Sequence, residues 1–155
     1  MDSDLKNLYQ DILLEHNHYP RNYGRLENPT HEAEGYNPLC GDHIHLTLRV
    51  VGDRIEDIRF EGRSCAICKA SASIMTTLVK QASLQVADQA FEAFHELLTQ
   101  PESPHAESLP AAAREKLALF ATVRNFPMRV KCATLPWHTL RAALHQPEQK
   151  IVSTE

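Results

Sequence analysis

Residues 43–60 read HIHLTLRVVGDRIEDIRF, and this stretch decides the fold. Apolar side chains occupy every second position over residues 44–50, which is the period-two pattern of a half-buried strand. Residues 51–54 have the Gly and Asp of a tight turn, and residues 55–60 read as the returning strand. The stretch therefore predicts an antiparallel β-hairpin.

The segment before the hairpin begins with a predicted helix. Its apolar residues recur at helical spacing after a capping Ser3 or Asp4. The helix should end by Tyr19, because Pro20 disfavours helical geometry in the residue before it. Residues 31–36 are expected to form a short edge strand.

Helical periodicity replaces the strand pattern after the hairpin. The predicted helices cover residues 65–80, residues around 87–98, a third segment that starts at Pro110 and is broken at Phe126-Pro127, and a last segment from 132–136 to about 144. Strands come first and helices follow, which indicates an α+β fold.

The composition fits one globular domain over residues 1–155 with a flexible tail at about 147–155. Apolar residues make up 43% and charged residues 23%, which excludes a wholly disordered chain. A net charge of -4 disfavours nucleic acid as the main partner, and no apolar run is long enough to span a membrane. The acidic start is unlike a signal peptide, so we expect a soluble, cytoplasmic protein.

Three of the four cysteines lie in contexts that suit chemistry. Cys40 precedes Gly41 and Asp42 in a turn, where glycine lets the backbone bend so that both side chains could face one point. Cys65 and Cys132 are predicted at helix N-termini, where the helix dipole and backbone N–H groups favour the thiolate.

These three thiols and the Asp42 carboxylate form a set suited to tetrahedral Zn²⁺ or to an iron–sulfur cluster. The gaps between them are wider than those of zinc fingers, so the spacing alone is weak support. The alternative for each cysteine is a small buried side chain without chemistry.

Cys65 and Cys68 also form a C-x-x-C pair, which can mark thiol–disulfide exchange. That interpretation expects a βαβ setting, whereas a hairpin precedes this pair. The simpler interpretation of Cys68 is a packed helix cysteine.

Taken together, the motifs resemble the IscU/NifU-N superfamily of iron–sulfur cluster assembly proteins. The resemblance lies in CGD at 40–42, GRSC at 62–65, ASAS at 70–73 and RVKCATL at 129–135, and it covers nearly the whole chain. The SufU branch is the most similar. Two features favour it: a helical insertion at about 100–125, and Arg129 with Lys131 ahead of the last cysteine, where cluster-scaffold members have a histidine.

The resemblance implies an α+β fold with a small antiparallel sheet of about three strands covered by helices. It also implies a zinc ion held by Cys40, Asp42, Cys65 and Cys132. Cys40 would accept persulfide sulfur from a SufS-type cysteine desulfurase, which makes the chain a zinc-dependent sulfurtransferase. Arg129 would act beside Cys40, by stabilising its thiolate or by steering the partner, unless it is an ordinary solvated arginine.

Three alternatives stay open at this point. The chain could be the scaffold on which an iron–sulfur cluster assembles, on the same cysteines. It could instead be an adaptor with a purely structural zinc ion, or a C-x-x-C thiol–disulfide protein. The expected partners are the desulfurase and a downstream scaffold or apo-protein, with the chain a monomer or weak homo-oligomer.

Overall fold

The computed structural model describes residues 3–99, 109–146 and 150–154. The helices and strands, in chain order, are α1 (Ser3–His18), β1 (His31–Asn37), β2 (Asp42–Val51), β3 (Arg54–Arg63), α2 (Ala66–Val79), α3 (Leu84–Thr99), α4 (Ala111–Ala118), the 3₁₀ helix η2 (Ala121–Asn125), α5 (Pro127–His145) and β4 (Ile151–Ser153). The fold is α+β, as predicted.

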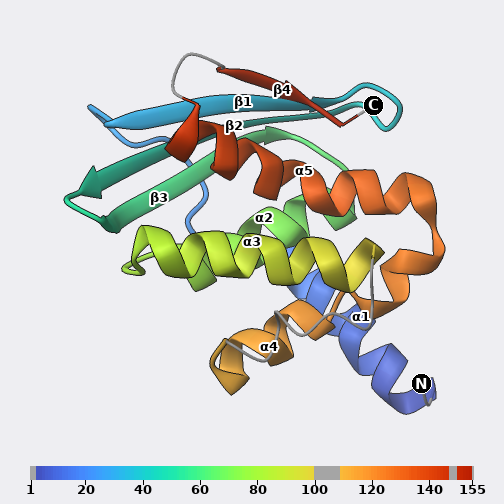
Figure 1. The fold of residues 1–155 in the computed structure, drawn as a ribbon. Coiled ribbons are helices and arrows are strands. Elements are labelled where there is room, and N and C mark those ends of the chain that lie inside the picture. The colour runs from blue at the N-terminus through green and yellow to red at the C-terminus, as the bar shows by residue number, and fades with distance from the viewer. Residues whose placement is uncertain (1–2, 100–108, 147–149, 155) are drawn as a thin grey trace.

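The predicted hairpin is confirmed as β2 and β3. The strands pair antiparallel, with Leu46 opposite Phe60 and Leu48 opposite Ile58, and all four side chains are buried. Gly52 in the connecting turn has a φ of +62°, a conformation that glycine adopts without steric cost. The alternation in the sequence thus places one face of the hairpin against the helices (Figure 1).

The sheet has four strands in the order β3-β2-β1-β4, and this corrects two predictions. β1 is antiparallel to β2 as expected, but it is not an edge strand, because β4 pairs parallel to it on the other side. Part of the expected flexible tail is therefore ordered: Thr154 N–H donates to the carbonyl oxygen of Tyr36 at 3.0 Å. A three-residue strand is too short to give a periodic signal in the sequence.

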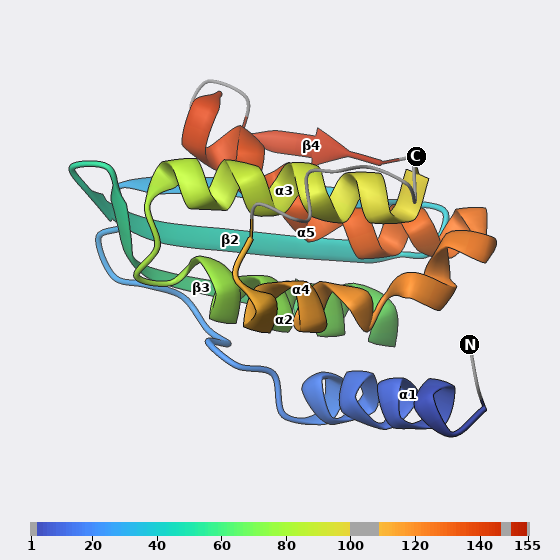
Figure 2. The ribbon, with the colours of Figure 1, turned by 60° about the horizontal axis from the view of Figure 1, so that its bottom comes forward.

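The helices lie together on one face of the sheet. α5 packs across β1 and β2, α2 packs beside it, and α1 lies on the far side of α2 (Figures 1 and 2). Phe94 of α3 stacks on Trp137 of α5 at 5.1 Å between ring centroids and meets Phe120 edge-on at 5.3 Å. One continuous core thus joins sheet and helices.

Two helices after residue 109 differ from the sequence prediction. The third predicted helix ends at Ala118 and gives way to η2, and the last helix begins at Pro127 instead of at residues 132–136. Proline suits the first turn of a helix, because its missing N–H would have no partner there. Of the predicted insertion, α4 and η2 lie within 109–125, and residues 100–108 lie outside the described chain.

Close contact between β1 and α5 depends on Gly35. A β-carbon at this position would overlap the hydroxyl of Thr139, so only glycine fits as the structure stands. The contact fixes the end of β1 relative to α5, and both elements carry residues of the candidate site.

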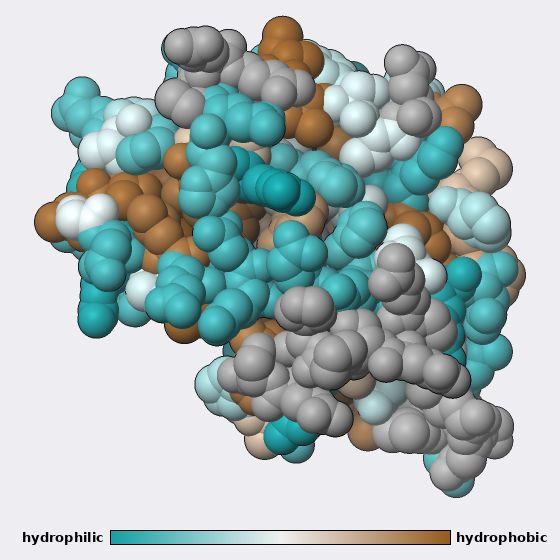
Figure 3. Space-filling view, viewed as in Figure 1, coloured by the Kyte–Doolittle hydropathy of each residue, from teal (hydrophilic) through white to brown (hydrophobic). Residues whose placement is uncertain are grey.

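The face of the molecule seen in Figure 3 is mostly hydrophilic outside the grey residues, with several apolar patches. No described helix combines the length and the apolar character that a membrane crossing requires.

Candidate metal centre

The loop between β1 and β2 presents Cys40. Asn37 and Asp42 are opposite each other as the last pair of the two strands, and Cys40 N–H donates to the carbonyl oxygen of Asn37 at 3.2 Å. Gly41 has a φ of +72°, so the turn needs a residue without a β-carbon. Cys40 is consequently exposed at the tip, whereas Asp42 is only 1% exposed.

Cys65 is the N-cap residue of α2, as the sequence predicts. Its sulfur accepts a hydrogen bond from Cys68 N–H at 3.4 Å, and its own backbone N–H donates to Asp42 Oδ1 at 2.7 Å. The other carboxylate oxygen, Oδ2, lies 3.9 Å from Cys65 Sγ. Asp42 thus connects the hairpin to the start of α2.

Cys132 lies inside α5 and not at its start. It is the sixth residue of the helix, since α5 begins at Pro127, and it is buried beside Ile44, Cys68 and Leu135. The prediction that helix N-terminal N–H groups favour a Cys132 thiolate is therefore wrong.

These segments converge on one point. The ligand atoms of Cys40, Asp42 and Cys132 all lie within 4.8 Å of one another, and Cys65 Sγ is near Asp42 at the distance given above. In a tetrahedral zinc site with Zn–S bonds of ~2.3 Å, neighbouring ligand atoms are separated by roughly 3.8 Å. The sulfurs of Cys40 and Cys132 and one oxygen of Asp42 could therefore hold a metal ion, and Cys65 Sγ lies near Asp42 just outside this group.

The thiols of Cys65 and Cys132 are less acidic than the sequence suggests. Burial raises the pKa of Cys65 and of Cys132, and hydrogen bonds with Cys40 and Asp42 act in the same direction on Cys132. Desolvation thus outweighs the helix N-terminus at Cys65. A bound cation would supply positive charge that stabilises the thiolates.

The other two residues singled out in the sequence are Cys68 and Arg129. Cys68 is fully buried next to Cys65 and Cys132, and burial raises the pKa of its thiol well above the usual value. Arg129 is exposed on the first turn of α5, with its guanidinium 5.2 Å from the ring centroid of Phe126.

Asn37 is a site residue that sequence reasoning missed. It is fully buried, and its side-chain N–H₂ donates to Cys132 Sγ at 3.4 Å and to Asp42 Oδ2 at 3.5 Å. The sequence shows an asparagine three residues before Cys40, but the strand register that sets it opposite Asp42 is not readable from one sequence.

The histidines of β2 lie outside this cluster. His43 and His45 share one face of the sheet, where His43 Nε2 lies 3.5 Å from Glu34 and His45 Nε2 lies 3.7 Å from Glu32. The group of metal-ligand side chains found among the described residues contains no histidine.

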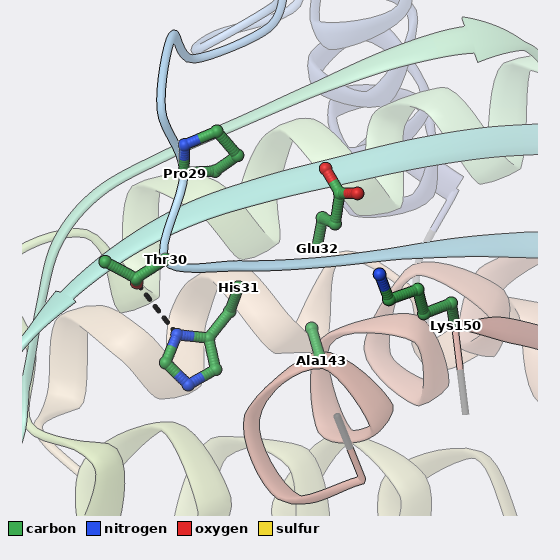
Figure 4. Close-up of a pocket in the computed structure, with 6 residues that line it drawn as sticks. All are labelled: Pro29, Thr30, His31, Glu32, Ala143 and Lys150. Atoms are coloured by element: carbon green, nitrogen blue, oxygen red, sulfur yellow. Dashed lines mark hydrogen bonds between the residues drawn. The ribbon is translucent and has the colours of Figure 1, made fainter. Parts of the chain in front are cut away.

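A cavity of about 540 Å³ lies at the opposite end of β1 and α5 from the cysteines (Figure 4). No cysteine is among its lining residues, which are Pro29, Thr30, His31, Glu32, Ala143 and Lys150. The chemistry that the sequence predicts therefore belongs to the cysteine cluster and not to this cavity.

Comparison with known proteins gives the same family as the motifs. Residues 8–150 match the family model described as NifU-like N terminal domain. A Bacillus subtilis protein named zinc-dependent sulfurtransferase SufU is 35% identical over 147 residues, which cover 95% of this chain and 96% of that protein. A Streptococcus pyogenes protein named iron–sulfur cluster assembly scaffold protein IscU is 37% identical over 142 residues, 92% of this chain and 86% of that protein.

A solved structure supports the fold in the same way. The crystal structure of a proposed iron–sulfur cluster assembly scaffold protein for the SUF system from Fervidobacterium islandicum aligns with a TM-score of 0.79 and 30% identity. The alignment covers 92% of this chain and 99% of that one.

Proposed function

The chain belongs to the NifU-like N-terminal domain family, and on this premise we propose that it is a zinc-bound acceptor of persulfide sulfur in iron–sulfur cluster assembly. The observation that carries the proposal is the convergence of Cys40, Asp42 and Cys132, with Cys65 beside them. The similarity to the zinc-dependent sulfurtransferase of Bacillus subtilis, over nearly the full length of both proteins, supports it.

In this proposal Cys40, Asp42, Cys65 and Cys132 hold the metal. Bound zinc would supply the positive charge that keeps the thiols of these cysteines deprotonated. Cys65 and Cys132 are fixed by α2 and α5, and they stay in place during the reaction. Cys40 is exposed on a loop, which makes it the thiol that a partner protein reaches first.

The transfer step is an exchange of the thiol–disulfide type. The Cys40 thiolate attacks the outer sulfur of a persulfide on a SufS-type cysteine desulfurase. A new sulfur–sulfur bond forms at Cys40, the partner's sulfur–sulfur bond breaks, and the electron pair leaves with the partner's thiolate. We propose that a side chain of the desulfurase replaces Cys40 as ligand, and that Arg129 helps to orient the partner. The persulfide would then pass to a cluster scaffold or an apo-protein, in the reducing cytoplasm that suits four free cysteines.

The proposal is tested by mixing the zinc-loaded chain with a cysteine desulfurase and free cysteine. Mass spectrometry should find one added sulfur atom on Cys40, and Cys40→Ala should remove both this adduct and the stimulation of the desulfurase. Cys68→Ser is the matched control and should retain both, because Cys68 is buried and is not a proposed ligand. Undiminished stimulation by Cys40→Ala would contradict the mechanism.

A second candidate function is supported by the similarity to the Streptococcus pyogenes scaffold protein. Here the same four residues would hold an iron–sulfur cluster instead of zinc. Anaerobic incubation with iron and sulfide separates the two: stable visible charge-transfer bands favour the scaffold, and a colourless protein that keeps zinc favours the sulfur acceptor.

A further inference from the structure

The side-chain amide of Asn37 contacts two of the proposed zinc ligands without being one itself. One amide N–H points to Cys132 Sγ, at a normal distance of 3.4 Å for a sulfur acceptor. The other points to Asp42 Oδ2 at 3.5 Å, the long end of the hydrogen-bond range. An amide carries two donors on one nitrogen, so it can serve both acceptors together.

The sheet fixes this position of Asn37. It pairs with Asp42 as the last residues of β1 and β2, and opposite residues of an antiparallel pair place their side chains on the same face. Its carbonyl oxygen also accepts the Cys40 N–H, which closes the turn of the loop. The amide therefore stays in place even when the Cys40 side chain moves.

The orientation of the amide follows from its neighbours. A carbonyl oxygen facing the Asp42 carboxylate and the Cys132 sulfur would be repelled when these groups are anionic, so the N–H₂ must face them. This orientation leaves the amide oxygen Oδ1 buried and without a hydrogen-bond partner in the described part of the chain. An apolar side chain of similar shape would avoid that loss, so the amide is present for its donors.

We propose that Asn37 is the positioning residue of this metal centre. Its two N–H donors hold Asp42 and Cys132 as a fixed pair of ligands, from β2 and from α5. Cys40 lies outside this clamp on an exposed loop, and it is the ligand that can leave without release of the metal. The inference rests on the proposed zinc-bound sulfur acceptor and adds what retains the metal during transfer.

The physical basis is the role of outer hydrogen bonds in metal sites. Donors to a thiolate or carboxylate ligand orient it and stabilise its charged form, and their loss typically weakens metal affinity ~10–100-fold. Cys65 has its own donor in the Cys68 N–H, so both cysteines that stay in place accept a hydrogen bond. Cys40 accepts neither N–H of the Asn37 amide, because Asn37 directs both of them to Cys132 and Asp42.

The experiment is a cycle of four full-length, zinc-loaded proteins: wild type, Asn37→Leu, Cys40→Ser, and the double variant. Zinc release to a chromogenic chelator is measured for each, and Cys40→Ser stands for the state in which Cys40 has left. We expect Cys40→Ser alone to retain zinc, and Asn37→Leu to accelerate release about 10–100-fold in that background. The visible spectrum of the cobalt-substituted proteins should also change with Asn37→Leu.

A structural role alone is excluded by two controls. Asn37→Leu should leave the thermal unfolding of the zinc-free protein unchanged. Thr47→Val removes a different buried polar group, in β2 and away from the cluster, and should not accelerate zinc release. If Asn37→Leu does not fold, Asn37→Ala, which loses the donors and adds no charge, is read in the same way. Release at the wild-type rate, or faster release only in step with lost stability, would overturn the inference. A wild-type chain that binds no zinc would instead refute the proposed function.

Discussion

Replacement of Asp42 separates two roles of one buried carboxylate. Oδ1 accepts the Cys65 backbone N–H at 2.7 Å, which ties the start of α2 to the hairpin. The carboxylate is also a proposed zinc ligand, next to Cys65 and Cys132. Asp42→Asn keeps an oxygen for the N–H but removes the charge, whereas Asp42→Ala removes both.

The structure gives the size of the effect on stability. A hydrogen bond to a charged group contributes about 1.5–3 kcal/mol, and removal of one partner leaves a buried donor unsatisfied. Relief of the buried charge offsets part of this loss, so we expect Asp42→Ala to lower the unfolding free energy of the zinc-free protein by about 1–3 kcal/mol. For a domain of this size that corresponds to a fall in Tm of roughly 2–12 °C. Asp42→Asn should change it by less than about 1 kcal/mol.

Zinc binding should respond differently from stability. Both variants lose the anionic oxygen ligand, so both should bind zinc at least about tenfold more weakly in competition with a chelator. Thermal unfolding of the zinc-free protein measures the effect of each variant on stability. Asp57→Asn is the matched control, because Asp57 Oδ1 also accepts a backbone N–H, from Ile58 at 2.9 Å, outside the cysteine cluster.

The zinc affinity and the unfolding temperature each test one of the two roles of Asp42. If Asp42→Asn binds zinc as tightly as the wild type does, Asp42 is not a ligand. If zinc-free Asp42→Ala unfolds at the wild-type temperature, the hydrogen bond to Cys65 does not anchor α2.

Three other predictions concern the fold. Gly35→Ala should destabilise the protein by about 1–3 kcal/mol, because the new methyl group overlaps the Thr139 hydroxyl. Adding Thr139→Ala to this variant should restore part of the lost Tm. No recovery would contradict this contact. Burial lowers the pKa of His138, so the unfolded chain binds a proton first as pH falls below about 6.5 and stability then decreases. His138→Gln should therefore lose less Tm than the wild type between about pH 7.5 and about pH 5.5, with part of the loss remaining because His16 is shifted in the same direction; an equal loss would argue against it. A chain ending at Gln146 lacks β4 and should have a Tm several degrees lower, because the backbone hydrogen bonds of Tyr36 and Glu34 to residues 150–154 are lost. An unchanged Tm would show that β4 adds no stability.

The sequence predicts the hairpin, α1, α2 and α3 because each has a long periodic pattern with clear ends. Gly52 marks the hairpin turn, and Pro20 lies just beyond the end of α1. The position of Cys65 at a helix start follows from the change of period after β3.

The start of α5, the strand β4 and the role of Asn37 depend on contacts between residues that are far apart in the sequence. Pro127 reads as a helix breaker, yet it is the first residue of α5, and this moved Cys132 into the helix interior. β4 is defined by its partner β1 and not by its own three residues. Asn37 lies at the cluster because of the register of β1 on β2, which one sequence does not show. The raised pKa values of Cys65 and Cys132 result from burial, which the sequence motifs do not predict.

The wide sequence separation of the cluster has a consequence for how the protein matures. During synthesis Cys40 and Cys65 leave the ribosome while Cys132 and the rest of α5 are still to be made. A nascent chain therefore offers a metal ion only three of the four proposed ligands, and the fourth, Cys132, arrives with the final helix. With the proposed ligand set, tight metal binding would require the finished polypeptide, and truncated products would lack one ligand.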